Sequence, residues 1–274
     1  MKKTFGLIGG DRRQAELASL LQSEGRRVKA YGLEGWKDSL EAAASADVVI
    51  LPLPLCRGEG VLNCEEGAVP TAELFRRLSP WQRILAGQVE PRQRREAEAC
   101  GLVLEDYFLR EELAVANAAA TAEGAIQTAM ERLDRTILGL DCLVIGFGRI
   151  GKLLSHRLQG LGARVTATAR KPGDLAWIRA YGCKALETGK LDGALGSFGL
   201  VYNTVPSPVL DGALLAQLPR DALCIDLASR RGIAAAANVV WARSLPGRLT
   251  PRTAAEAIRD AVDYILLEER GDPA

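Results

Sequence analysis

The sequence has 274 residues, a length that predicts two domains at roughly 100–200 residues each. Lys and Arg together number 35 and Asp and Glu 34, so the net charge of +1 lacks the basic excess that nucleic-acid binding requires. No eighteen apolar residues run together, and the start at Met1 is followed by no cleavage-type segment. We therefore expect a cytoplasmic protein with neither a nucleic-acid nor a membrane partner.

The chain has one histidine, His156. A Ser/His/Asp triad, a multi-histidine metal site and a His–Glu hydride-transfer pair would each depend on it. At 100° per residue it lies away from the apolar face of its predicted helix, so we expect it on the surface. That apolar face comprises Ile150, Leu154, Leu158 and Leu161. The six cysteines form no Cys-x-x-Cys pair and are expected to be reduced and buried, and we expect no metal site.

In the first half of the chain, short apolar runs alternate with helical patterns. Thr4–Ile8 predicts a strand, residues 11–24 a helix and Val28–Tyr31 the next strand. Asp47–Leu55 predicts a buried strand, and a long polar loop over residues 56–70 follows it. The alternation continues through Thr71–Leu78, Ile84–Ala86, Pro91–Cys100 and Leu102–Leu104. This order predicts a parallel sheet covered by helices.

A long alanine-rich helix is predicted from Arg110 to about Arg135, and we interpret it as a connector. Strand and helix then alternate again from Asp141–Gly146, and a last helix is predicted from about Thr253 to Glu269. The elements predicted between them are a helix from Arg149, the strand Arg164–Ala169, a helix through Trp177, and the strands Gly199–Tyr202 and Leu223–Leu227.

The predicted fold class is α/β, with two doubly wound parallel-sheet domains joined by the connector helix. Residues 1–110 form a flavodoxin-like substrate domain, which the C-terminal helix over 251–270 could complete. Residues 111–137 form the connector. Residues 138–250 are predicted to form a Rossmann domain, and the motif described next predicts that it binds NAD(P).

The strongest motif is Gly146-Phe147-Gly148-Arg149-Ile150-Gly151, a G-x-G-x-x-G pattern between a predicted strand and a predicted helix. Gly146 permits a tight turn, and Gly148 lets the backbone approach a pyrophosphate. Gly151 lets the helix pack closely on the sheet, and the helix N-terminus stabilises the anion. The motif predicts a dinucleotide site.

The end of the next strand, Thr168-Ala169-Arg170, indicates which dinucleotide binds. Ala169 stands where an NAD-preferring enzyme carries an acidic residue for the ribose 2′-hydroxyl. Arg170, with Lys171 beside it, can pair with a 2′-phosphate. We therefore expect NADP in preference to NAD, unless these two cations belong only to a solvated turn.

Two further strand ends are expected beside the cofactor, Asn203-Thr204-Val205-Pro206 and Asp226-Leu227-Ala228-Ser229. Asn203 and Thr204 can bond ribose or carboxamide groups. Ordinary turn chemistry is the alternative for both segments, and a third such turn is Leu245-Pro246-Gly247.

Near the N-terminus, Gly9-Gly10-Asp11-Arg12-Arg13 ends a strand and opens a helix. It is not a second G-x-G-x-x-G motif. Asp11 can cap the helix, while Arg12 and Arg13 at its N-terminus can bind a carboxylate. The sequence leaves both interpretations open.

Residues 106–117, followed by Thr121-Ala122-Glu123-Gly124-Ala125-Ile126, resemble the connector of the dipicolinate synthase A-subunit family. The motifs described above occur in the family's order along nearly the whole chain. One departure follows Ser229, where the family continues with a Pro-Gly-Gly-like turn and this chain has Arg230-Arg231-Gly232-Ile233.

This resemblance implies oxidation of a dihydrodipicolinate-type precursor to pyridine-2,6-dicarboxylate with reduction of NAD(P). It also implies the mother cell of a sporulating bacterium and, as partner, the flavoprotein-like B subunit of the synthase. Separately from the resemblance, we expect a homo-oligomer. A dicarboxylate substrate needs cationic clamps, for which we consider Arg12 first and also Arg57, Arg110 and Arg230. Asp11 or Glu123 is expected to accept or orient a proton, although Glu123 could equally pair with a neighbouring side chain.

Two other functions fit parts of the sequence. A D-2-hydroxyacid dehydrogenase shares the two-domain plan, but its catalytic histidine would lie in the last third of the chain, where no histidine occurs. A cofactor-binding regulatory or assembly subunit, inactive without its partner, remains the alternative.

Overall fold

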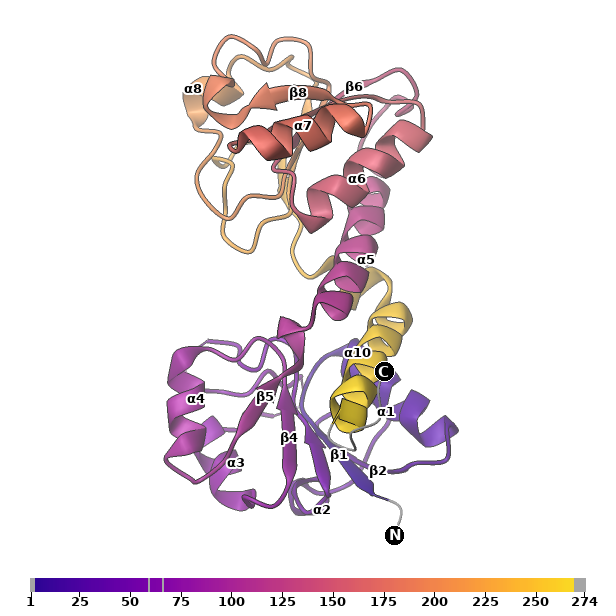
Figure 1. Ribbon diagram of the computed structural model, residues 1–274, viewed down its shortest axis with the longest axis vertical. Coiled ribbons are helices and arrows are strands. Elements are labelled where there is room, and N and C mark those ends of the chain that lie inside the picture. Colours follow the sequence, from indigo (N-terminus) through magenta and orange to yellow (C-terminus); the bar gives the residue numbers. More distant parts are fainter. Residues whose placement is uncertain (1–2, 59, 66, 269–274) are drawn as a thin grey trace. The chain divides into compact units, whose positions relative to one another are not determined.

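A computed structural model describes residues 3–58, 60–65 and 67–268. The chain divides into two compact units (Figure 1). The first unit comprises Met1–Asn117 and Gly247–Ala274, and the second comprises Ala118–Pro246. No helix among the described residues is long and apolar enough to cross a membrane.

The sheet of the first unit is parallel throughout, with the order β2-β1-β3-β4-β5 in its described residues. This is the flavodoxin-like order. Its strands are β1 (Thr4–Ile8), β2 (Arg27–Tyr31), β3 (Val48–Ile50), β4 (Arg83–Ala86) and β5 (Leu104–Asp106). Its helices are α1 (Arg12–Ser23), α2 (Leu40–Ala44), α3 (Thr71–Arg77), α4 (Pro91–Glu98) and α10 (Pro251–Glu268).

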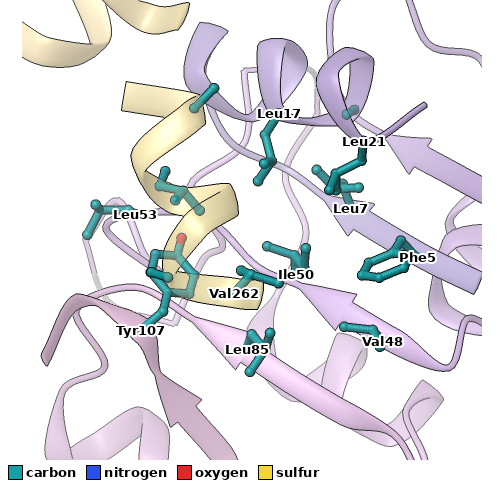
Figure 2. Packing of buried hydrophobic residues seen from close by; sticks show 14 of the residues in the cluster. Phe5, Leu7, Leu17, Leu21, Val48, Ile50, Leu53, Leu85, Tyr107 and Val262 are labelled. Atoms are coloured by element: carbon teal, nitrogen blue, oxygen red, sulfur yellow. The ribbon is translucent and has the colours of Figure 1, made fainter. Parts of the chain in front are cut away.

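Successive strand residues point to opposite faces of this sheet, so each face has its own core. Leu7 and Ile50 belong to the cluster that α1 and α10 cover, whereas Ile8 and Val49 belong to the cluster under α2, α3 and α4. In Figure 2, Val262 of α10 lies among the labelled strand residues of the first cluster. The C-terminal helix is therefore part of the core of the first unit.

The second unit contains a six-stranded parallel sheet with the order β11-β10-β9-β6-β7-β8. Counted from β6 as the first strand, this is the 3-2-1-4-5-6 order of the Rossmann fold. The strands are β6 (Asp141–Ile145), β7 (Arg164–Ala169), β8 (Lys184–Glu187), β9 (Leu200–Asn203), β10 (Leu223–Asp226) and β11 (Val239–Trp241). The helices are α6 (Arg149–Gly160), α7 (Pro172–Ala180) and α8 (Gly212–Leu215). The expected fold class of two parallel-sheet α/β domains is confirmed.

The boundary between the units falls inside α5 (Glu111–Met130), and α9 (Leu245–Leu249) spans the second boundary. The expected connector helix extended to about Arg135, but α5 ends earlier because residues 131, 132, 134 and 135 are exposed and no packing sustains another turn. α10 begins at Pro251, before the predicted Thr253, since proline suits the first helical turn. The predicted end at Glu269 lies outside the described residues.

Candidate functional site

The glycine turn of the second unit has the geometry that its sequence predicts. Gly146 has φ of +97°, and a Cβ there would lie 2.5 Å from Oγ1 of Thr204. A Cβ on Gly151 would lie 2.1 Å from the Gly146 carbonyl oxygen, so only glycine allows α6 to approach β6 this closely. A Cβ on Gly148 would meet nothing within 4 Å, and no side chain caps the N-terminus of α6. The turn thus leaves helix N–H groups and space for an anion.

Two threonines hold this turn in place. The Gly146 N–H donates to Oγ1 of Thr168 at 3.3 Å, and Thr168 is also bonded by the Thr188 hydroxyl at 3.1 Å. The hydroxyl of Thr204 donates to the Ile145 carbonyl at 3.0 Å, beside its backbone N–H at 2.9 Å. Thr168 and Thr204 therefore fix the position of the turn.

The other predicted residues of the turn differ in exposure. Phe147 is buried, and its ring packs edge-on against Tyr181 with centroids 5.8 Å apart. Arg149 is exposed and Ile150 half-buried. The contact between Phe147 and Tyr181 packs the turn against the rest of the second unit.

Asn203 and Asp226 are completely buried and bonded to each other. The Asn203 amide donates to Oδ1 of Asp226 at 2.8 Å and to the Val205 carbonyl at 3.0 Å, while its oxygen accepts from the Val205 N–H at 2.9 Å. The carboxylate of Asp226 also accepts the N–H groups of Ala228, Gly232 and Ile233. Asn203 and Asp226 thus join the loop after β9 to the loop after β10, which is the turn chemistry considered as the alternative to ligand binding.

The remaining predicted residues of these two segments lie on the loops themselves. Thr204 and Val205 are half-buried and Pro206 is exposed; Leu227 and Ala228 are buried and Ser229 is exposed. The structure thus brings both segments to the carboxyl ends of β9 and β10, which are neighbours in the sheet and of which β9 pairs with β6.

Ala169 is the last residue of β7 and is buried, whereas Arg170 and Lys171 are exposed. No ion pair joins either cation to an acidic residue within the second unit, all of whose residues are described. Both charges are therefore available to a ligand at the end of the strand that follows α6.

In the first unit, Asp11 caps α1 by accepting the N–H of Arg13 at 3.0 Å. Arg12 is exposed, while Arg13 is buried and donates to both carboxylate oxygens of Asp11 and to the Leu53 carbonyl. Burial alone would raise the pKa of Asp11, but the hydrogen bonds and charge of Arg13 outweigh it and lower that pKa. The sequence favoured Arg12; the buried arginine at this strand end is Arg13, which an i, i+2 Asp–Arg pair at a helix cap could have indicated.

Two other candidates are engaged in ion pairs. Glu123 of α5 accepts from Nη2 of Arg157 at 3.0 Å, which is the neighbour pairing left open by its sequence. Arg110 binds Glu268 of α10 at 2.9 and 3.0 Å and also pairs with Glu112. Arg110 thus ties α10 to the rest of the first unit.

His156 is exposed, as expected. Of the predicted apolar face, Leu154 and Leu158 are buried, whereas Leu161 follows the last turn of α6 and is 38% exposed. Among the described residues no group of three or more His, Cys, Asp and Glu side chains gathers that could hold a metal ion.

A pocket of about 250 Å³ lies in the first unit. It is lined by Pro54, Cys56, Gly58, Gly60, Gln88, Glu90, Arg92 and Gln93. Burial, with the charges of Glu96 and Glu90, raises the pKa of Cys56 to about 11, so its thiol stays protonated at neutral pH and is a poor nucleophile. The expectation of buried cysteines holds for Cys142, Cys183 and Cys224 but was wrong for the rest, which are half-buried because they lie in or beside loops: Cys56, Cys64 and Cys100.

The fold and the glycine turn define a two-domain α/β protein with a Rossmann domain of the dehydrogenase type. D-lactate dehydrogenase from Escherichia coli shares this fold, with a TM-score of 0.63 at 14% identity over 98% of both chains. Within this class, residues 4–108 match the family described as the N-terminal domain of the dipicolinate synthase A subunit.

The likeness extends beyond that domain. The A subunit of dipicolinate synthase from Bacillus subtilis (strain 168) is 27% identical over 96% of both chains. The crystal structure of the dipicolinate synthase A chain from Bacillus subtilis superimposes with a TM-score of 0.85 at 26% identity, covering 100% of this chain and 98% of that one. The chain is therefore similar to the dipicolinate synthase A subunit over nearly its whole length, as its sequence led us to expect.

Proposed function

We propose that the chain is an NADP-linked oxidoreductase that acts on a CH–CH type donor. Its substrate in this proposal is a dihydrodipicolinate-type precursor, which it oxidises to dipicolinate during bacterial sporulation. The observation that carries the proposal is the uncapped N-terminus of α6 behind an unobstructed Gly148, in a relative of the dipicolinate synthase A subunit. The B subunit of the synthase would be its partner.

The residues present fit a dinucleotide. Gly146, Gly148 and the first N–H groups of α6 would hold the pyrophosphate, and Arg170 with Lys171 would bind a 2′-phosphate. Bound NADP would accept a hydride from the ring of the substrate. The substrate also loses a proton and becomes aromatic, so the protein has mainly to orient the ring and keep it close to the cofactor.

A regulatory or assembly subunit is the second candidate, and a specific observation favours it. Two of the three proposed catalytic residues, Asp11 and Glu123, hold arginine side chains in the structure. The Asp11 carboxylate binds Arg13 through both of its oxygens, and Glu123 binds Arg157 through Oε1. In this alternative the chain binds NADP and the chemistry requires the partner.

The test follows NADPH absorbance while freshly made hydroxytetrahydrodipicolinate, which loses water to give the dihydrodipicolinate, is supplied with and without the B subunit. We expect reduction of NADP and formation of dipicolinate by the chain alone. Turnover only when the B subunit is present supports the second candidate. No NADPH and no dipicolinate in either case would contradict both.

A further inference from the structure

The loop Arg230-Arg231-Gly232-Ile233 is held by hydrogen bonds to a buried carboxylate. It follows β10, and the N–H groups of Gly232 and Ile233 donate to Oδ2 of Asp226 at 2.7 and 3.0 Å. A Cβ at Gly232 would lie 2.3 Å from Nδ2 of Asn203, so glycine is required where the loop crosses that side chain. These contacts fix the backbone directly after the two arginines, at the carboxyl edge of the sheet.

At the carboxyl edge of the sheet, two arginine side chains lie against the indole ring of Trp241. Trp241 ends β11, and its Nε1 donates to the Ala228 carbonyl at 2.9 Å. The guanidinium carbon of Arg231 lies 5.0 Å from the ring centroid and that of Arg243 lies 4.7 Å from it. Both are within cation–π range of the same ring. The two guanidinium groups therefore cannot be farther apart than these two distances combined.

No acidic side chain of the second unit forms an ion pair with either arginine. Within the fully described second unit, no ion pair involves Arg231 or Arg243, although ion pairs form elsewhere in the unit, as between Arg164 and Asp141. Both arginines are exposed and carry like charges against one ring, so binding an anion beside them would lower their mutual repulsion. Planar guanidinium groups match a carboxylate in shape and charge.

The position of the pair indicates which anion it meets. The pyrophosphate turn follows β6, while β9, β10 and β11 extend the sheet away from β7, whose end carries Arg170. Strands lie about 4.8 Å apart, so β11 is about 14 Å from β6, too far for a pyrophosphate at the turn. An anion there belongs to a molecule beside the cofactor, on the side of the sheet opposite the 2′-phosphate.

We propose that Arg231 and Arg243, held on Trp241, bind a carboxylate of the substrate. This assignment rests on the proposed function and adds specificity-determining residues to it. It also gives the loop Arg230-Arg231-Gly232-Ile233 a role: a cationic clamp carried by the second unit, independent of Arg12 and Arg13 in the first.

The test measures binding by calorimetry with the full chain, using pyridine-2,6-dicarboxylate as the probe, with and without NADP. Arg231→Gln and Arg243→Gln should each weaken binding of the dicarboxylate about tenfold or more, since each removes a charge-assisted hydrogen bond. Trp241→Leu should weaken it as well, because the platform is lost. Affinity for NADP should change less than about twofold in each.

Arg220→Gln is the matched control, because Arg220 is exposed and precedes the amino end of β10, whereas Arg231 follows its carboxyl end. Unchanged dicarboxylate affinity in Arg231→Gln and Arg243→Gln, or a loss of NADP affinity in its place, would overturn the proposal. So would absence of dicarboxylate binding by the unaltered protein. If NADP does not bind, the proposed function is contradicted. The dicarboxylate titration without NADP still tests the proposal for Arg231 and Arg243.

Discussion

Gly247 lies directly against the side chain of Arg13. A Cβ at position 247 would stand 2.9 Å from Nε of Arg13 and 3.1 Å from Oδ2 of Asp11. The Asp11–Arg13 pair, formed within the first turn of α1, is thus packed in by a segment from the other end of the chain. Leu245-Pro246-Gly247 was expected to be a turn beside the cofactor, but in the structure it is the first part of α9, and Gly247 there packs against Arg13.

Asp11→Asn should lower the free energy of unfolding by about 3 kcal/mol, because it leaves the buried guanidinium of Arg13 without a counter-charge. The folded-state pKa of Asp11 lies below its ordinary 3.8, so its contribution is present above that pH and lost as the pH falls through the folded value. Urea unfolding from neutral pH to below 3.8 should show a smaller acid loss of stability in the variant than in the unaltered protein. An equal loss in both would contradict this account.

Two glycine substitutions in the turn should separate folding from cofactor binding. Gly151→Ala drives a methyl group into the Gly146 carbonyl and should cost about 1–3 kcal/mol of stability. Gly148→Ala meets no protein atom, so it should leave the melting temperature nearly unchanged and weaken NADP binding about tenfold. Thermal unfolding and cofactor titration of both variants check this; equal melting losses would refute the distinction.

Substitutions at the end of β7 should shift the preference of the protein from NADP towards NAD. Ala169→Asp places a carboxylate near the 2′-position, and Arg170→Gln removes a charge-assisted bond of about 1.5–3 kcal/mol. Each should lower the ratio of NADP to NAD affinity about tenfold or more. Tighter binding of NAD than NADP by the unaltered protein would contradict the assignment even if the enzyme class stood.

Asp226→Asn should destabilise the second unit by about 3 kcal/mol, because an amide cannot accept all the N–H groups that converge on this buried carboxylate. Asp211→Asn is a useful control. Asp211 is exposed and caps α8, where asparagine caps nearly as well. Chemical unfolding should therefore separate the two variants clearly.

His156→Gln should leave both the melting temperature and NADPH formation unchanged, since His156 is exposed on α6. The measurement is a comparison of kcat/KM across pH. A lost pH dependence near neutrality would show that imidazole takes part after all.

Periodicity predicted the two sheets and the glycine turn because both depend on local spacing. It missed β8 and β11, since Lys184–Glu187 and Val239–Trp241 are short strands whose residues are mostly half-buried or exposed. Periodicity also does not predict which side chains pair with each other. That Arg13 and not Arg12 turns inward, and that Glu123 meets Arg157, are consequences of packing between segments.

The placement of α10 bears on the order in which the chain folds as it leaves the ribosome. The core of the first unit includes Ile258 and Val262, so that unit lacks part of its interior until these residues have been made. The second unit is continuous in sequence and is complete by Pro246. During synthesis, the domain encoded second can therefore reach its final structure first, while the sheet that begins at Thr4 keeps one face open for the last helix.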